Sequence, residues 1–189
     1  MAMYHADLAL RDNLIREKKL GDGYHKDMKA LHLSNANQLE SILDEIGFPT
    51  ADKVGREAYE AAWMIAQHSI GSPKFMRKFA QLLAEAVENQ KADKKLLAYL
   101  NDRIAVLEGK PQQFGTQFDW DENGELSPNL MDNVSLVNER RATLGMNSIE
   151  EQTQSIRERS KLEHQRPPKD ATKRKKEMDE WRRAVGWLD

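Results

Sequence analysis

Polar side chains gather in two stretches of the chain where helix formation alone would not require them. Residues 109–118 (GKPQQFGTQF) combine Gly, Pro and Thr with three Gln. Each amide side chain offers two donors and an acceptor, so such a cluster suits a polar ligand or an irregular backbone. The second stretch is Gln67-His68, which closes a segment rich in Ala, Trp and Met. Together these residues predict a site for a small polar or anionic ligand.

His68 is the candidate for acid–base chemistry. Ile65, Met64 and Ala61 precede it by three, four and seven residues, so His68 shares the inward face of a predicted helix. An imidazole titrates near neutrality and can act as general acid or base. The alternative is a structural histidine at a helix end, bonded to a carbonyl and stabilised by the helix dipole. The sequence leaves both interpretations open.

Tyr99, Asp102 and Arg103 form a second polar group on one predicted helix. Asp102 lies beside the apolar stripe of that helix, where its carboxylate could orient a histidine. Arg103 could bind a carboxylate or phosphate through two parallel hydrogen bonds. The alternative is that Asp102 and Arg103 each cap a neighbouring loop, because adjacent residues on a helix do not face one another.

The third group lies in residues 109–118. In an extended segment Gln112 and Thr116 point to one side and Gln117 to the other. Gly115 would permit a ligand to approach closely or the backbone to adopt a strained angle. The alternative is a buried loop pinned through its amide side chains. The complete predicted site has two catalytic candidates, His68 and Asp102, and six substrate-binding candidates: Gln67, Tyr99, Arg103, Gln112, Thr116 and Gln117.

Several other chemistries are not expected. The five histidines show no HExxH or ExxH spacing on one helix, which argues against a zinc or di-iron site. The chain has no phosphate-binding GxxxxGK, no GxGxxG and no GxSxG motif. It has no cysteine, which excludes disulfides, thiolate metal sites and a cysteine nucleophile. We therefore expect neither a metal nor a cofactor.

Composition points to a soluble cytoplasmic protein. The net charge is -2, so no global field draws the chain to nucleic acid or to a membrane. The N-terminal residues contain no signal-peptide core, and no run approaches the roughly 20 apolar residues of a membrane span.

The elements that position the candidate residues are predicted to be helices. The fold class is mainly α: a single helical domain over residues 1–165, of five to seven helices, with a small inserted β-hairpin and a charged helical tail over residues 166–189. The hairpin is expected at residues 113–127, because Asn123-Gly124 favours a tight turn. The predicted helices cover residues 6–20, 34–46, 51–68, a segment starting at Pro73, 93–108, 134–144, 148–163 and 171–188.

The tail suggests a partner surface. From Ser155 onward there are 11 Lys/Arg and 7 Asp/Glu, giving +4, so the rest of the chain carries -6. Trp181 and Val185 lie along one side of the predicted last helix. Basic and aromatic side chains together could contact nucleic acid, but the interleaved acidic residues argue against it. We expect the helix to dock on the body of the protein, on a protein partner or on a second copy of the chain.

A series of short motifs carries a resemblance to a known family. In chain order the motifs are Val54-Gly55, Ala62-Trp63, Gln67-His68, AYL with Asp102-Arg103, GKPQ, GTQ, and VNERRATLG at residues 137–145. This order resembles a bacterial family of unknown function whose members show a VG…AW…QH…AYLxDR…GxPQxYGTQ series. The resemblance spans about residues 39–151. It implies no particular activity, but it concentrates on the same polar residues.

Two departures from the family pattern bear on function. Members usually carry an acidic residue shortly after the QH pair, where this chain reads Ser69-Ile70-Gly71, and they favour Tyr where this chain has Phe114. If either group takes part in catalysis, this chain is a binding variant or inactive. The favoured hypothesis is a metal-independent enzyme with His68 as general acid or base and Asp102 as its orienting group. The rival is a non-catalytic interaction module that uses the C-terminal helix.

Overall fold

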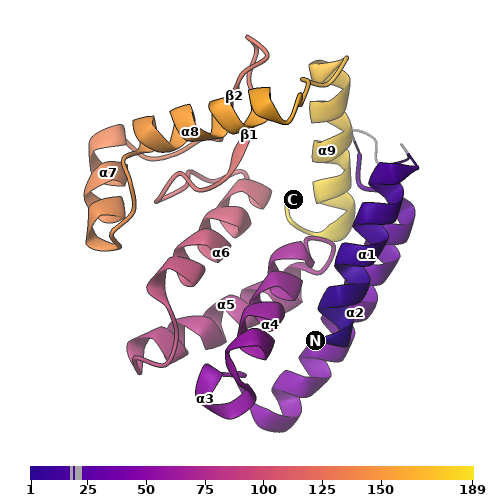
Figure 1. The fold of residues 1–189 in the computed structure, drawn as a ribbon, viewed down its shortest axis with the longest axis vertical. Helices are drawn as coiled ribbons and strands as arrows, with labels where there is room; N and C mark the ends of the chain where they lie inside the picture. The colour runs from indigo at the N-terminus through magenta and orange to yellow at the C-terminus, as the bar shows by residue number, and fades with distance from the viewer. Residues whose placement is uncertain (18, 20–22) are drawn as a thin grey trace. The chain divides into compact units, whose positions relative to one another are not determined.

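The chain forms two compact helical units. A computed structural model describes residues 1–17, 19 and 23–189 (Figure 1). Unit 1 comprises Met1–Leu97 and unit 2 comprises Ala98–Asp189, so the boundary falls inside one helix. The predicted division into a domain over residues 1–165 and a tail over residues 166–189 stays a prediction.

Unit 1 is built from packed helices. Its elements are α1 (Ala2–Arg16), α2 (Lys26–Ile46), α3 (Ala51–Val54), α4 (Arg56–His68), α5 (Pro73–Glu88) and the first turn of α6 (Lys94–Leu107). Helices α1, α2 and α4 contact one another, and α5 packs on α4 (Figure 1). The Phe79 ring, fully buried, lies 5.3 Å from the Phe48 ring and 6.1 Å from the Phe75 ring. The contacts among α1, α2 and α4 bring the buried faces of these three helices together.

Three predicted helices of unit 1 have different bounds in the structure. The single helix predicted over residues 51–68 is wrong at Gly55, whose φ of 83° ends α3 and begins α4. The helix predicted over residues 34–46 begins earlier, at Lys26, because His25 caps it by accepting from the Asp27 N–H. The helix predicted over residues 6–20 spans Ala2–Arg16, and its predicted end at Leu20 lies outside the described residues.

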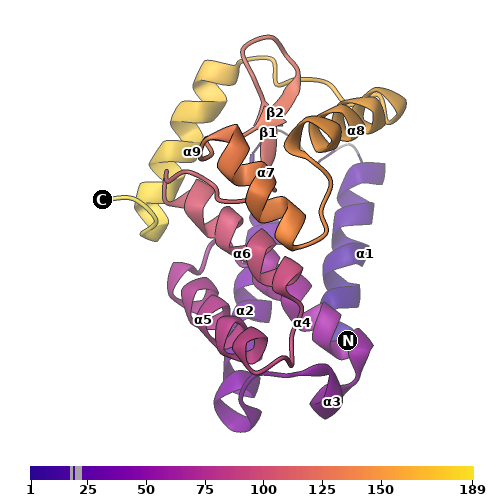
Figure 2. The same ribbon diagram turned by 90° about the vertical axis from the view of Figure 1, so that its left-hand side faces the viewer.

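Unit 2 combines the rest of α6 with a small hairpin and three further helices. Strands β1 (Phe118–Trp120) and β2 (Leu126–Pro128) pair antiparallel, with Asp119 opposite Ser127. Helix α8 (Ile149–Leu162) contacts β2, and α7 (Val134–Thr143) contacts α8 (Figure 2). The helix predicted over residues 148–163 begins as expected, with a capping box of Ser148 and Glu151 at the start of α8. The hairpin is confirmed, but its first strand is shorter than predicted, because residues 113–117 form a loop.

The charged tail forms α9 (Ala171–Val185) as part of unit 2. Arg174 donates to both carboxylate oxygens of Asp119 at 2.9 Å, and Arg182 donates to the Val106 carbonyl at 2.8 Å. Trp187, just after the helix, is buried. The tail therefore contacts the hairpin and α6 of its own unit.

The fold is mainly helical, as predicted, but the number of helices is larger. Residues 1–17, 19 and 23–189 hold nine helices and one two-stranded hairpin, whereas five to seven helices were expected. The break at Gly55 and the short α3 account for part of the difference. Over the same residues, no helix has both the length and the apolar character needed to cross a membrane.

Candidate functional site

A carboxylate and two imidazoles meet inside unit 1. Asp7 comes from α1, His32 from α2 and His68 from the last position of α4. His32 Nε2 lies 3.0 Å from Asp7 Oδ1, and His68 Nδ1 lies 2.5 Å from Asp7 Oδ2. Tyr24 extends the chain of contacts, because its hydroxyl lies 2.7 Å from His32 Nδ1. These four side chains, Tyr24, His32, Asp7 and His68, form what we call the Asp7 network.

The Asp7 network opens to solvent at one end. Asp7 is 1% exposed, and the His32 side chain is 9% exposed. The His68 side chain is 26% exposed, so it is the member of the Asp7–histidine cluster that solvent and small molecules can reach. His68 also ends α4, where the helix dipole favours positive charge.

The hydrogen bonds determine which nitrogen of each histidine carries the proton. A carboxylate only accepts, so His32 donates from Nε2 and His68 donates from Nδ1. Neutral His32 then accepts at Nδ1 from the Tyr24 hydroxyl. Neutral His68 is left with an unprotonated Nε2, which has no hydrogen-bond partner among the described residues. The network therefore presents a free imidazole lone pair at its exposed end.

Charge in the network is held on Asp7. Burial disfavours the ionised carboxyl, but the hydrogen bonds from His32 and His68 outweigh burial and hold the pKa of Asp7 well below its usual range. Burial, with the nearby charge of Asp7, raises the pKa of Tyr24, so its hydroxyl stays protonated and available to donate. An ionised Asp7 beside His68 would stabilise the imidazolium that forms when Nε2 takes up a proton.

The sequence-predicted site residues fall in both units. His68 and the buried Gln67 lie in unit 1. Unit 2 holds the other six: Tyr99, Asp102, Arg103, Gln112, Thr116 and Gln117. Within unit 1 the orienting carboxylate of His68 is Asp7. The catalytic role predicted for Asp102 and the substrate-binding roles stay predictions.

In unit 2, Asp102 organises a loop. Its buried carboxylate accepts from the backbone N–H groups of Gln113 at 2.8 Å, Phe114 at 3.2 Å and Thr116 at 3.0 Å. Burial raises the pKa of Asp102, and these donors oppose that rise. Successive N–H groups converging on one carboxylate fix the backbone of residues 113–116.

The amide of Gln112 is also occupied by the loop. Its Nε2 donates to the carbonyls of Gln117 and Asn129, both at 3.1 Å, and its Oε1 accepts from the Gln117 N–H at 2.7 Å. Thr116 accepts from the Gln117 side chain at 3.0 Å. Arg103 has a partly buried guanidinium whose pKa burial lowers. The contacts of Asp102 and Gln112 match the structural alternative, a loop pinned by its polar side chains.

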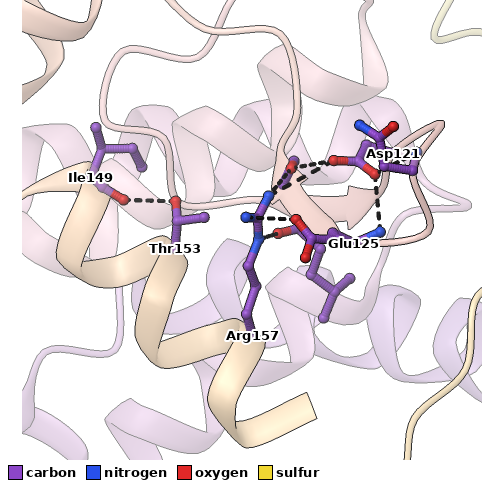
Figure 3. Close-up of polar contacts among 8 residues, drawn as sticks. Asp121, Glu125, Ile149, Thr153 and Arg157 are labelled. Carbon is purple, nitrogen blue, oxygen red and sulfur yellow. Dashed lines mark hydrogen bonds and ion pairs between the residues drawn. The ribbon is translucent and has the colours of Figure 1, made fainter. Parts of the chain in front are cut away.

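A separate cavity lies between α8 and the hairpin of unit 2. It has a volume of about 590 Å³, and its described lining includes Met131, Ile149, Arg157 and Lys161. Figure 3 shows Arg157 reaching from α8 to the hairpin, where it contacts Glu125 at 2.7 Å and donates to the Leu126 carbonyl at 2.9 Å. The described lining contains none of the sequence-predicted site residues.

Comparison with known proteins identifies the family. The model of a family of unknown function, DUF6624, matches residues 1–163. The chain belongs to the DUF6624 family. The match confirms the resemblance expected from the motif series and extends it to α1, so it includes all four residues of the Asp7 network. No curated protein and no solved structure matches the chain.

Of the Asp7 network in this DUF6624 chain, the sequence predicted only His68 as a site residue and missed the other three members. Asp7 and His68 are 61 residues apart, so no motif spacing on a single helix indicates their contact. A signal was present, however. Asp7 precedes the buried Leu14 by two helical turns, and His32 lies four residues from both Met28 and Ala36 on a buried face. Polar residues on inward faces need partners, which is why these two meet.

Proposed function

We propose that this protein is an enzyme that acts on a small polar or anionic substrate, with His68 as general acid or base. Asp7 is the residue that orients His68 and stabilises its charged form, and the acid–base step needs no metal ion. The observation that carries the proposal is the 2.5 Å contact between Asp7 Oδ2 and His68 Nδ1, which leaves Nε2 available at the exposed end of the network.

The physical argument follows the logic of carboxylate–histidine pairs. A buried carboxylate bonded to Nδ1 holds the imidazole in one orientation and in the tautomer that leaves Nε2 free. When Nε2 accepts a proton from substrate, the positive ring faces a negative carboxylate in a medium of low dielectric constant. A positioned acid or base of this kind contributes about 10²–10⁴-fold to a reaction rate.

Asp7 itself is held by the other half of the network. His32 occupies Oδ1 at 3.0 Å, and Tyr24 fixes the ring of His32 at 2.7 Å. Because His32 bonds to Oδ1 of Asp7, the second oxygen, Oδ2, is directed at His68. Tyr24 and His32 are therefore positioning residues in the proposal.

The substrate class comes from the sequence. Arg103 as anion contact, and Gln67, Tyr99, Gln112, Thr116 and Gln117 as hydrogen-bonding groups, remain predictions of the substrate-binding wall. The cytoplasmic location expected from composition is likewise a prediction.

The alternative proposal is a non-catalytic interaction module that uses the C-terminal helix. The exposed side chains of α9 include Lys173, Lys176, Glu177 and Glu180, a face of mixed charge that suits a protein partner or self-association better than nucleic acid. Loss of residues 169–189 would abolish that association on this view, and mass measurement in solution reports it.

A ligand screen tests the enzymatic proposal. The wild-type protein, His68→Gln and the matched control His5→Gln, an exposed histidine on α1, are compared by thermal shift against a panel of metabolites. Ligand binding to the native state raises the melting temperature. We expect a compound that stabilises wild type and the control more than His68→Gln, and that the wild type converts. A compound bound equally by His68→Gln, or turned over at the wild-type rate by that variant, would contradict the proposal.

A further inference from the structure

We propose that Asp7, His32 and His68 also form a binding site for one divalent transition-metal ion such as Zn²⁺, and that the bound ion switches His68 off as a base. Each of the three residues offers one ligand atom, and these atoms all lie within 4.8 Å of one another. The three side chains come from α1, α2 and α4, so packed helices hold them on three sides.

The spacing of the ligand atoms is close to that of a tetrahedral site. Zinc binds histidine nitrogen and carboxylate oxygen at about 2.0–2.2 Å, which places two ligand atoms roughly 3.3 Å apart. The 3.0 Å pair of His32 Nε2 and Asp7 Oδ1 is near this value. His68 Nδ1 contacts the other carboxylate oxygen, Oδ2, at 2.5 Å, so His68 or the carboxylate has to shift before one oxygen lies at this spacing from both imidazoles. His68 lies at a helix end and is the most exposed of the three, so it can make this adjustment.

The types of the donor groups favour zinc and its neighbours over magnesium or calcium. Two imidazoles and one carboxylate suit Zn²⁺, Co²⁺, Ni²⁺ and Fe²⁺, whereas Mg²⁺ and Ca²⁺ prefer oxygen ligands. The ionised Asp7 compensates part of the charge of the metal. Three protein ligands leave one coordination position for water or an exogenous group.

The Tyr24 hydroxyl can hold the ring of His32 when that histidine binds a metal ion. A metal-bound histidine usually donates its other N–H to an oxygen, which fixes the ring. When Nε2 of His32 binds metal, its proton lies on Nδ1, which is 2.7 Å from the Tyr24 hydroxyl. The hydroxyl then accepts instead of donating, and the contact is preserved. Tyr24 is a positioning residue for the metal site, as it is for the network without metal.

Metal binding changes the tautomer of His68. With Nδ1 bound to the ion, the proton of the neutral ring lies on Nε2, so the lone pair that would act as a base is lost. No proton leaves the protein in this change, because each neutral imidazole moves its proton from one nitrogen to the other. The metal site shares its residues with the proposed function but does not depend on it, since metal binding is measured without a substrate.

Calorimetry on the untagged, full-length, metal-stripped protein tests the proposal. Titration with ZnCl₂ is expected to give one ion per chain, and CoCl₂ is expected to give the visible absorption bands of a four-coordinate site. MgCl₂ is the negative control and is expected not to bind, because Mg²⁺ prefers oxygen ligands. His68→Gln and His32→Gln are expected to lose the binding, and His5→Gln, an exposed histidine on α1, to keep it. Tyr24→Phe is expected to weaken Zn²⁺ binding by about 10–100-fold.

A second measurement covers the case in which His32→Gln does not fold. In the wild-type protein, Co²⁺ is expected to shift the imidazole NMR signals of His32 and His68 strongly and that of the exposed His5 of the same unit less. Zn²⁺ is expected to move the His68 proton from Nδ1 to Nε2, which the ring ¹⁵N shifts report. Absence of stoichiometric Zn²⁺ binding by wild type, equal binding by His68→Gln, or Co²⁺ shifts larger at another histidine than at His32 and His68 would each overturn the proposal. Failure of the metal titration alone leaves the acid–base proposal standing, because that proposal is judged by the substrate screen.

Discussion

Replacing Asp7 by Asn is the most informative single change in unit 1. The substitution keeps the shape of the side chain but exchanges one acceptor oxygen for a donor NH₂ group. The oxygen of the new amide can still accept from His32 Nε2. The NH₂ group then faces His68 Nδ1, where the wild-type protein has an N–H donor 2.5 Å from a carboxylate oxygen. In this orientation His68 avoids a clash of two donors by moving its proton to Nε2. In the reverse orientation of the amide, His32 has to change tautomer instead, with Tyr24 accepting from its Nδ1.

The expected cost of this change is about 2 kcal/mol of unfolding free energy. Hydrogen bonds to a charged group contribute about 1.5–3 kcal/mol, and neutral ones about 0.5–1.5 kcal/mol. Two bonds change from the first kind to the second, and the lower desolvation cost of a neutral side chain offsets part of the loss. The same exchange in Ser-His-Asp triads lowers kcat about 10⁴-fold because the histidine adopts the wrong tautomer.

Two assays check the Asp7→Asn prediction. Denaturant unfolding gives the free energy, with Asp12→Asn, an exposed residue of the same helix, as the control that is expected to change by less than about 0.5 kcal/mol. Ring ¹⁵N NMR gives the tautomer of His68 in wild type and variant without any substrate. The reasoning is refuted if His32 and His68 both keep their wild-type tautomers in Asp7→Asn, or if the two variants are equally stable.

Three further predictions concern unit 2. Gly115→Ala is expected to lower the free energy of unfolding by about 1–3 kcal/mol in denaturant unfolding, because φ is 62° and the new Cβ would lie 2.7 Å from Ile149 Cδ1. Adding Ile149→Val should recover part of that loss. If the destabilisations of the two substitutions simply add in the double variant, the clash is not the cause. Asp102→Asn is expected to cost about 2–4 kcal/mol by the same assay, since one amide oxygen cannot satisfy all the backbone N–H groups that the carboxylate bonds, and hydrogen exchange should then rise in residues 113–116. The hairpin turn is expected to loosen in acid, because backbone and Ser127 donors lower the pKa of Asp121 below 3.8. The ionised Asp121 carboxylate stabilises the turn above about pH 4, and this stabilisation is lost as pH falls through the lowered pKa. Amide NMR shifts across the turn follow this loss, and an unchanged turn at about pH 2 contradicts it.

The sequence predicted the helical fold well where apolar periodicity and caps agreed. Pro73 begins α5 as expected, and Ser148 with Glu151 begins α8. The prediction failed where one residue overrides a continuous pattern. The apolar spacing of residues 51–68 runs through Gly55, and only its positive φ divides α3 from α4. The predicted start of the second helix at residue 34 is also wrong, because Ser34 lies inside α2, where it accepts from the Gln38 side chain.

The candidate site was only partly accessible to sequence reasoning, for a physical reason. The polar residues of the 109–118 segment predicted a ligand site because they are clustered along the chain. Their closeness in sequence reflects a loop that satisfies its own backbone, as the contacts of Asp102 and Gln112 indicate. Asp7, His32 and His68 come instead from three different helices, and Asp7 and His68 are 61 residues apart. Only the packing of those helices brings these three residues together.

The difference between the two polar clusters is itself an argument about function. Gln112 uses both of its donors and its acceptor within unit 2, as expected of a side chain that holds a loop in place. The contacts of Asp7 with the two histidines instead end in one imidazole nitrogen without a partner among the described residues, on the 26% exposed side chain of His68. A buried ionised carboxylate is weak evidence for stability, because apolar residues often fill such space equally well. A buried carboxylate that fixes the tautomer of an accessible histidine has a chemical consequence, and that is why the proposed acid–base role is assigned to His68 with Asp7.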